Sequence, residues 1–307
     1  MKNKKNELLK FILIILFTTA TYSFSQAGDE SFRFSVTADT RDNAGESNDS
    51  VEYFKGVLEA LKLVGAGEFM LSPGDIDPPV DIRWSIDKYF GKDYIWYPVL
   101  GNHEKETESD MEYLREYNTG GNKLPYIVNM GPEGTEETMY SFDFGNSHFV
   151  VLNQYYDGTC DVCVDGDIND PIYKWLRSDL AKTDKTNIFI FGHEPAFVQP
   201  DEYNGRIRHN GDSLDKYRST RDRFWNLLED EKVIAYFCGH THNYSSVLIN
   251  NVWQIDSGHA RGKGDEGAPS TFLTVDIKGN EVTLTVYRDS HNGDYDYKDI
   301  VKSFRIK

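Results

Sequence analysis

Five short apolar runs in this 307-residue chain are each followed within a few residues by side chains that can bind metal ions. Their β-branched and aromatic composition is typical of buried strands. A carboxylate, amide or imidazole placed just past a strand has no packing purpose, and open α/β sheets bind ligands at the carboxyl ends of their strands. The runs are residues 32–38, 69–72, 95–100, 187–191 and 233–238.

The polar residues after these runs form an ordered series of motifs. Glycine directly precedes the first polar residue in four of them, which predicts close backbone approach. In the last motif two imidazoles lie two residues apart, so both can reach one point in irregular backbone. Taken together, the series predicts a metal site. The motifs are Asp39-Thr40-Arg41, Gly74-Asp75, Gly101-Asn102-His103-Glu104, Gly192-His193-Glu194 and Gly239-His240-Thr241-His242.

This ordered set resembles the motifs of the metallophosphoesterase (calcineurin-like phosphoesterase) superfamily. The resemblance implies an α/β fold, namely a four-layer αββα sandwich of two mixed β-sheets flanked by helices, with the metal site at strand ends. It also implies a dinuclear centre that activates water to hydrolyse a phosphate ester. The implied ligands of the first ion are Asp39 and His242, and those of the second ion are Asn102, His193 and His240. Asp75 would bridge both ions.

The residue types suit that chemistry. Hydrolysis of an anionic ester needs cations that neutralise its oxygens and lower the pKa of a bound water. Mixed nitrogen and oxygen donors favour iron, manganese or zinc, so the expected cofactor is two divalent or trivalent ions of these metals. His103, which the resemblance leaves unliganded, would give a proton or hydrogen bond to the leaving oxygen. The implied partner is a small phosphorylated substrate.

Two positions depart from the family pattern. Arg41 stands where many members have a histidine ligand, and a guanidinium cannot bind a metal ion. Two roles remain open for Arg41: it clamps a phosphate oxygen, or it pairs with Asp39 or Asp42. Pro78 stands where relatives have a tyrosine ligand or an aspartate that orients the catalytic histidine, and we assign that orienting role to Glu104.

The missing imidazole also supports an alternative function. A chain with an incomplete first metal site could be a catalytically impaired metal- or phosphate-binding protein of the same fold. Loops that leave the ligand strands supply further candidates for substrate binding, because such loops fold back over the metals. These candidates are His209 and Ser213 in one loop, and His259 and Arg261 in another.

The amino terminus predicts export. Residues 1–25 contain lysines, an apolar block at 11–17 and a small-x-small ending at Ser23-Phe24-Ser25, the pattern of a signal peptide. An uncleaved membrane anchor is disfavoured because the solid apolar run is shorter than the ~20 residues that a span needs. We therefore expect a secreted or periplasmic domain, residues 26–307, with no stable membrane anchor.

Charge and cysteine content add two expectations. The net charge is −17, which argues against nucleic-acid binding through a basic face. Cys160 and Cys163 lie among aspartates that raise the pKa of a thiol, which argues against a redox nucleophile. In an exported chain they predict a small local disulfide, and Cys238 is expected to be a buried free thiol.

The remaining hydrophobic pattern predicts the elements around the site. Apolar residues at helical spacing follow the first strand, which indicates a βαβ opening. A long polar segment before the first hairpin is expected to be a loop, either a lid over the site or a connector. The late strands are expected to close the second sheet. The predicted helices are 50–64, 81–89, 106–117 and 171–182, the loop is 118–137, the hairpins are 140–153 and 244–257, and the late strands are 271–277, 281–287 and 301–306.

Overall fold

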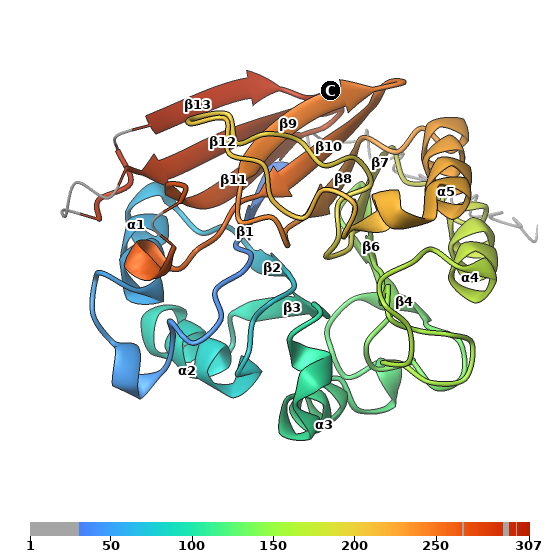
Figure 1. Cartoon of the computed structure of the whole chain (residues 1–307), viewed down its shortest axis with the longest axis horizontal. Coiled ribbons are helices and arrows are strands. Elements are labelled where there is room, and N and C mark those ends of the chain that lie inside the picture. Colours follow the sequence, from blue (N-terminus) through green and yellow to red (C-terminus); the bar gives the residue numbers. More distant parts are fainter. Residues whose placement is uncertain (1–30, 266, 291–294, 299) are drawn as a thin grey trace, which may run out of the picture.

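The computed structural model describes residues 31–265, 267–290, 295–298 and 300–307. Two mixed β-sheets pack face to face, and helices cover the outer face of each (Figure 1). The predicted four-layer αββα sandwich is therefore confirmed. The predicted signal peptide, residues 1–25, lies outside the described residues.

The first sheet has six strands in the order β13-β12-β11-β1-β2-β3. Strands β1, β2 and β3 are parallel, whereas β11 to β13 form an antiparallel meander that pairs with β1 through β11. The late strands thus extend the first sheet, and the expectation that they close the second sheet was wrong. The strands are β1 (Ser31–Val36), β2 (Phe69–Pro73), β3 (Ile95–Val99), β11 (Ser270–Lys278), β12 (Glu281–Asp289) and β13 (Ile300–Arg305).

The second sheet has seven strands in the order β4-β5-β6-β7-β8-β10-β9. Its four central strands β6, β7, β8 and β10 are parallel. Edge strand β4 lies inside the segment predicted to be a loop, so that prediction was wrong at residues 127–130. The strands are β4 (Ile127–Met130), β5 (Tyr140–Phe144), β6 (Ser147–Val151), β7 (Asn187–Phe191), β8 (Ala235–Cys238), β9 (Tyr244–Ile249) and β10 (Val252–Ser257).

Phenylalanine rings fill the space between the sheets. Phe34 of β1 stacks on Phe69 of β2, and its edge meets Phe149 of β6 in the opposite sheet at 5.3 Å between ring centroids. Phe191 and Phe237 stack on adjacent strands of the second sheet. Each fully buried ring contributes about 1.5–3 kcal/mol by leaving water, so this layer fixes the two sheets against each other.

Helices bury one apolar face each on the outside of the sheets. Helices α1 (Phe54–Val64), α2 (Pro79–Phe90) and α3 (Glu108–Tyr117) share a buried cluster with the first sheet. Helices α4 (Asp170–Leu180) and α5 (Arg218–Asp230) pack on the second sheet, on the opposite side of the molecule (Figure 1).

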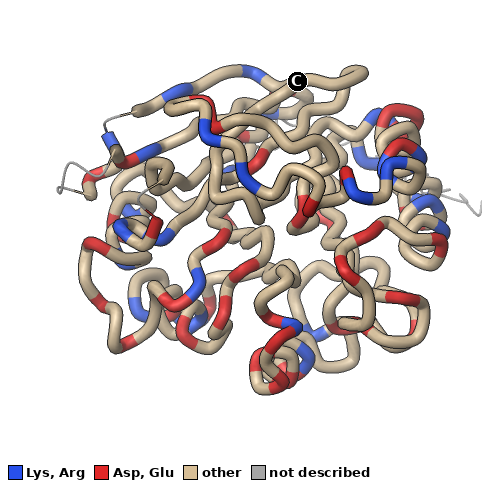
Figure 2. The backbone as a smooth tube through the Cα atoms, viewed as in Figure 1, with Lys and Arg blue, Asp and Glu red and all other residues tan. Residues whose placement is uncertain are grey.

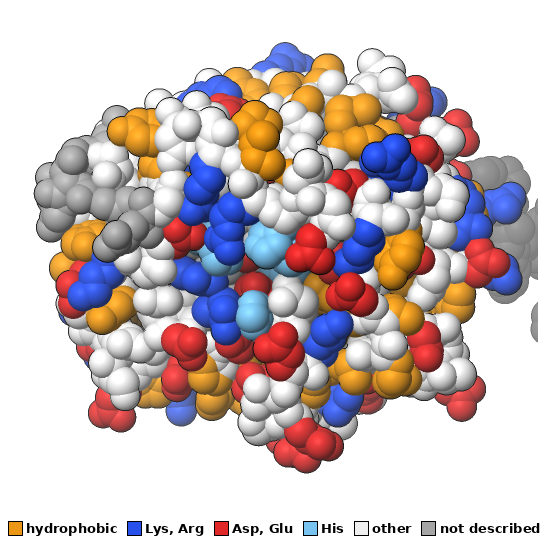
Figure 3. All heavy atoms as spheres, in the orientation of Figure 1, with side chains coloured by type: hydrophobic (Ala, Val, Ile, Leu, Met, Phe, Trp, Pro, Cys, Tyr) orange, Lys and Arg blue, Asp and Glu red, His pale blue; other side chains and the backbone are white. Residues whose placement is uncertain are grey.

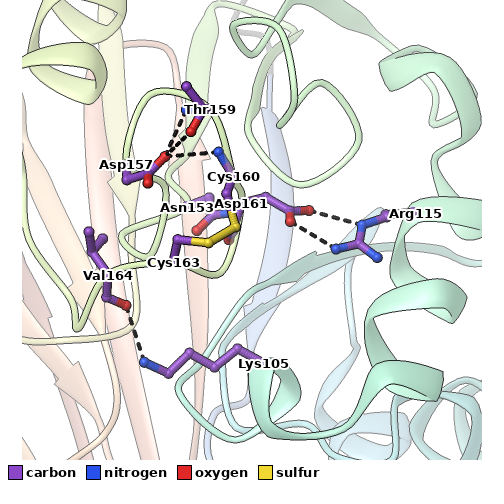
Figure 4. The surroundings of a disulfide bond; sticks show 9 residues. All are labelled: Lys105, Arg115, Asn153, Asp157, Thr159, Cys160, Asp161, Cys163 and Val164. Carbon is purple, nitrogen blue, oxygen red and sulfur yellow. Dashed lines mark hydrogen bonds and ion pairs between the residues drawn. A yellow bond between two sulfur atoms is a disulfide. The ribbon is translucent and has the colours of Figure 1, made fainter.

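The segment after β6 is closed by a disulfide. Cys160 and Cys163 are bonded, and Cys238 in β8 is a buried free thiol, so both predictions are confirmed. Within the same segment Asp161 accepts two hydrogen bonds from Arg115 of α3, at 2.8 and 3.0 Å (Figure 4). The disulfide-closed segment is thereby attached to the helix that follows the third motif.

A buried charge network ties α4 to the second sheet. His148 of β6 is only 2% exposed, and its two ring nitrogens lie 2.7 Å from Asp143 and 2.9 Å from Asp179. The other Asp179 oxygen accepts hydrogen bonds from Ser141 and Asn129. Burial opposes protonation of the ring, but the two carboxylates outweigh it and raise the pKa of His148 above 6.5.

This network predicts a pH-dependent stability. A histidine whose pKa is raised by folding contributes stability below its unfolded pKa and loses that contribution as pH rises through the folded value. We expect the free energy of unfolding to fall as pH increases above 6.5, and to fall less steeply in His148→Gln, which cannot titrate. Urea denaturation at a series of pH values measures both slopes. Equal slopes in the two proteins would contradict the assignment.

Candidate metal centre

The predicted ligands converge at one edge of the sandwich. They follow the carboxyl ends of parallel strands from both sheets, which face each other across the core. Asp39 follows β1, Asp75 follows β2 and Asn102 follows β3, whereas His193 follows β7, and His240 and His242 follow β8.

Glycines before the ligands allow this convergence. A β-carbon at Gly74 would lie 2.3 Å from Nδ1 of His193, and one at Gly239 would lie 2.3 Å from a carboxylate oxygen of Asp39. Both distances are far below van der Waals contact, so only glycine fits. The close approach that the sequence predicts is thus present in the structure.

Several ligand residues themselves adopt unusual backbone conformations. Asp39, Asp75, His240 and His242 have φ values between 49° and 71°, the left-handed region that non-glycine residues rarely occupy. Such strain persists only where surrounding structure imposes it, and it gathers at functional sites. Here it turns the side chains of four separate motif positions toward one centre.

Four electron-pair donors meet at the second predicted metal position. Oδ1 of Asn102 lies 3.1 Å from Nε2 of His193 and 3.0 Å from Nδ1 of His240. The same Nε2 of His193 lies 3.2 Å from Oδ1 of Asp75. Donors bound to one ion at about 2.1 Å lie about 3.0–3.4 Å apart in octahedral or tetrahedral geometry, so these three contacts have the spacing of neighbouring metal ligands. Ligand atoms of Asp39, Asp75 and His193 also lie within 4.8 Å of one another.

Backbone carbonyls fix the tautomer of both imidazoles. Nδ1 of His193 donates to the Pro73 carbonyl at 2.8 Å, and Nε2 of His240 donates to the Asp212 carbonyl at 2.9 Å. The opposite nitrogen of each ring therefore directs its lone pair at the centre, the usual outer-shell arrangement of a metal-binding histidine. Burial lowers the pKa of both rings to about 3, which keeps them neutral.

The first predicted metal position is different. Both carboxylate oxygens of Asp39 accept the one backbone N–H of His240, each at 3.0 Å, and Oδ1 lies 3.6 Å from Nε2 of His242. That nitrogen also lies 3.1 Å from Nη2 of Arg261. Burial and the charge of the neighbouring carboxylate of Asp75 raise the pKa of Asp39.

His103 lies at the mouth of this centre. Its ring is 25% exposed, and Nε2 lies 3.7 Å from Oδ2 of Asp75. Nδ1 lies 3.3 Å from Glu106. Glu104, to which we assigned the orienting role, is fully buried, and its carboxylate accepts the backbone N–H groups of Asp75, Ile76 and Gly101. The orienting assignment is therefore corrected: Glu104 fixes the two ligand loops, and Glu106 contacts the histidine.

Arg41 takes neither of its two expected partners. Its guanidinium pairs with Asp77, at 3.1 Å from Nε to Oδ1, beside the ligand loop of β2. It also lines a cavity of about 80 Å³ above the ligands, which leaves the phosphate-clamping role open. Figure 3 shows histidine and basic side chains together at the centre of this face. The cavity is lined by Arg41, Asp75, Asn102, His103, Arg208, His209, His240 and His242.

The four candidates for substrate binding lie at different depths. His209 lines the cavity, and its ring centroid is 4.1 Å from that of His240. Ser213 is buried, and its hydroxyl donates to the His209 carbonyl, so it shapes the loop. His259 and Arg261 are buried beneath the cavity, where His259 lies 3.0 Å from the Ala268 carbonyl and Arg261 donates to the Asp39 carbonyl at 2.7 Å. Of the four, only His209 lines the cavity.

Arg208 and Asp265 belong to the site, although the sequence did not single them out. Arg208 lies against Nδ1 of His242, and Asp265 lies 2.7 Å from the same nitrogen. Burial opposes ionisation of Asp265, but hydrogen bonds from His242 and Arg206 hold its pKa well below the ordinary range. The sequence could have indicated these two residues only by their closeness to predicted site residues. Arg208 directly precedes His209, and Asp265 follows Arg261 by four residues.

A two-sheet sandwich with carboxylate, amide and imidazole donors at its strand ends defines a metal-dependent hydrolase of the metallophosphoesterase type. The profile of the calcineurin-like phosphoesterase family matches residues 32–244, more than half of the chain. The chain therefore belongs to the calcineurin-like phosphoesterase family.

Curated relatives are purple acid phosphatases of Arabidopsis thaliana. Purple acid phosphatase 22 is 29% identical over 154 residues, which are 48% of this chain and 30% of that protein. Purple acid phosphatase 18 is 26% identical over 201 residues, which are 63% of this chain and 38% of that protein. The matches thus span about a third of the length of these relatives.

Solved structures share the fold at low identity. GAP50, described as the anchor in the inner membrane complex of Plasmodium, matches with a TM-score of 0.55 and 14% identity, over 90% of this chain and 89% of that chain. PhoD also matches with a TM-score of 0.55, at 11% identity, over 89% of this chain and 68% of that chain.

The corrected role of Glu104 can be tested by an isosteric substitution. Glu104→Gln replaces an acceptor oxygen by an NH₂ group that meets backbone N–H donors, so we expect about 1–3 kcal/mol less unfolding free energy and weaker Mn²⁺ binding. Urea denaturation and titration calorimetry measure the two effects. Glu106→Gln, at the more exposed neighbouring carboxylate, is the matched control and should change neither quantity. Equal losses in both variants would refute the role.

Proposed function

We propose that this chain is an exported phosphoesterase that hydrolyses a small phosphorylated substrate with a metal-activated water. The convergence of Asp75, Asn102, His193 and His240 on one point carries the proposal. When bound there, a metal ion supplies positive charge to the phosphate oxygens and lowers the pKa of a water. Family membership and the purple acid phosphatase relatives support the same reaction class. The number of ions, expected to be two, is considered below.

The side chains above the ligands have separate tasks. Arg41 and Arg208 line the cavity and place guanidinium groups where phosphate oxygens would lie. The ring of His103, partly exposed and free of the ligand cluster, is placed to protonate the leaving oxygen. The cavity of about 80 Å³ is far smaller than the about 300–1,000 Å³ of clefts that enclose drug-sized ligands. It therefore holds the reacting group, and the leaving group extends outside.

Export is supported by independent features. Residues 1–25 have the pattern of a signal peptide, and disulfides such as Cys160–Cys163 persist in oxidising compartments. We propose a secreted or periplasmic domain, residues 26–307, without a stable membrane anchor. No helix in the described part of the chain has the length and apolar character needed to cross a bilayer.

The net charge of the chain limits the classes of molecule that it can bind. Acidic residues are distributed over much of the fold (Figure 2), and the net charge of −17 disfavours nucleic acid as a ligand of a basic face. An acidic body repels phosphate at long range, so the local guanidinium groups and metal charge must attract it at the site. We propose a small phosphorylated molecule as the substrate.

Turnover and metal content together separate this proposal from the alternative of an impaired binding protein. The purified protein loaded with Mn²⁺ is assayed with an aryl phosphate monoester and a bis-aryl phosphate diester. Hydrolysis of either ester that is abolished by Asp75→Asn is the expected result. Bound metal without turnover of either ester, in wild-type protein, would favour the binding protein instead.

Replacement of His103 tests the proton-donating role. His103→Ala should retain bound metal, because the ring is not part of the donor cluster, yet lower kcat by ~10²-fold, the usual scale for loss of a general acid. Steady-state kinetics and metal analysis of the same preparation give both values. An unchanged kcat would reject the role, and so would loss of the metal.

Arg208 and its neighbour Arg206 form a matched pair for testing phosphate binding. Both guanidinium groups bond Asp265, at 3.2 and 2.9 Å, but only Arg208 lines the cavity. Arg208→Ala should weaken competitive inhibition by inorganic phosphate by about 10- to 150-fold, the equivalent of a hydrogen bond to a charged group. Arg206→Ala should leave that inhibition constant nearly unchanged. Equal effects would show that Arg208 acts through Asp265 alone.

A further inference from the structure

We propose that this centre holds a single metal ion, at the Asp75, Asn102, His193 and His240 position, and that the guanidinium of Arg261 takes the place of the other cation. The inference rests on the proposed metal-dependent function but departs from the expected dinuclear centre. It follows from the contacts of His242, from the residues that replace other ligands, and from the balance of buried charge.

Both ring nitrogens of His242 lie beside guanidinium donors. Nε2 lies 3.1 Å from Nη2 of Arg261, and Nδ1 lies against Nη1 of Arg208. If the ring donates from Nδ1 to Asp265, its Nε2 lone pair accepts a hydrogen bond from Arg261. In the other tautomer the Nδ1 lone pair accepts from Arg208. Either way the lone pair that a metal would need is directed at an arginine.

Arg261 is held firmly in this place. The residue is only 8% exposed, and its Nε donates to the Asp39 carbonyl at 2.7 Å. Its backbone follows β10, a strand of the parallel set that carries the ligand loops. A guanidinium remains charged in proteins and offers only donors, so at this distance it competes directly with a metal ion for His242.

The other donors of a first metal site are also replaced. Arg41, two residues after Asp39, cannot bind a metal ion and pairs with Asp77. Pro78, three residues after Asp75, offers no side-chain donor. With His242 engaged by arginine, Asp39 and the shared Asp75 remain of the first-ion ligands, and their ligand atoms lie within 4.8 Å of that of His193, a ligand of the other ion.

Buried charge is balanced by one ion and one arginine. Asp39, Asp75 and the fully buried Glu104, which accepts the Asp75 backbone N–H, contribute three negative charges at the centre, and Arg261 contributes one positive charge beside them. One divalent ion then brings the sum of these charges to zero. A second divalent ion would lie close to Arg261 in a poorly solvated site, where repulsion between like charges is strong.

The experiment counts Mn²⁺ ions on the purified protein. Wild-type protein, saturated with Mn²⁺ and freed of excess metal, should contain one ion per chain by elemental analysis and show the spectrum of isolated Mn²⁺ in electron paramagnetic resonance. His242→Ala should keep that ion, whereas His240→Ala should lose it. Circular dichroism of both variants reports whether they are folded.

Two Mn²⁺ ions per chain with a spin-coupled spectrum in the wild-type protein would overturn the inference, as would loss of the ion in a folded His242→Ala variant. The wild-type count does not depend on turnover. A dinuclear protein that hydrolyses phosphate esters would therefore refute the single-ion centre and leave the proposed function intact. A one-ion protein without hydrolysis would refute the function and leave the single-ion centre intact.

Discussion

One constraint governs the edge of the sandwich that carries the ligand side chains. Electron-pair donors that are clustered and buried need a cation between them. Asn102, His193 and His240 direct uncharged lone pairs at one point, and Asp75 adds a carboxylate to it. Without a positive charge these groups repel one another, and their removal from water is costly. Three features hold these donors together around the position of a cation. They are the carbonyls that fix the tautomers, the strained backbone and the glycines that permit close approach.

The two sheets provide the rigidity that this convergence requires. Donors arrive from strands of different sheets, so their separation is set by the phenylalanine layer between Phe34 of the first sheet and Phe149 of the second. A loosened core would move the donor sets relative to each other. Glu104 gives a second, local constraint, because one carboxylate joins the loop after β2 to the loop after β3. Site geometry is thus tied to packing both through the core and through one buried acid.

The sequence predicted the site correctly where a short local pattern determines the position of a side chain. An apolar run that ends in Gly-Asp or Gly-His places the side chain at a strand end, so the strand-end donors could be read from the pattern, and the layered fold followed from the resemblance to a known family. The prediction failed where pairing between strands far apart in the sequence determines which sheet a strand joins. The meander of residues 270–305 could join either sheet, and β4 is a short edge strand with weak alternation. Arg208 and Asp265 reach the site through irregular loops, whose path no periodicity encodes.

The arginines around the first metal position explain why family motifs alone are an incomplete guide here. Asp39 is retained, yet its carboxylate also accepts the His240 backbone N–H and faces Arg261, so it has a structural use that does not depend on a metal. His242 is likewise retained, but its ring joins a network with Asp265 and two arginines. A sequence motif shows which residue is present at a position, but the function of that residue depends on the groups that contact it in the structure. Under the proposed single-ion centre, Arg261 supplies a charge that the buried carboxylates make necessary, and it does so from a position outside the residues that the family profile matches.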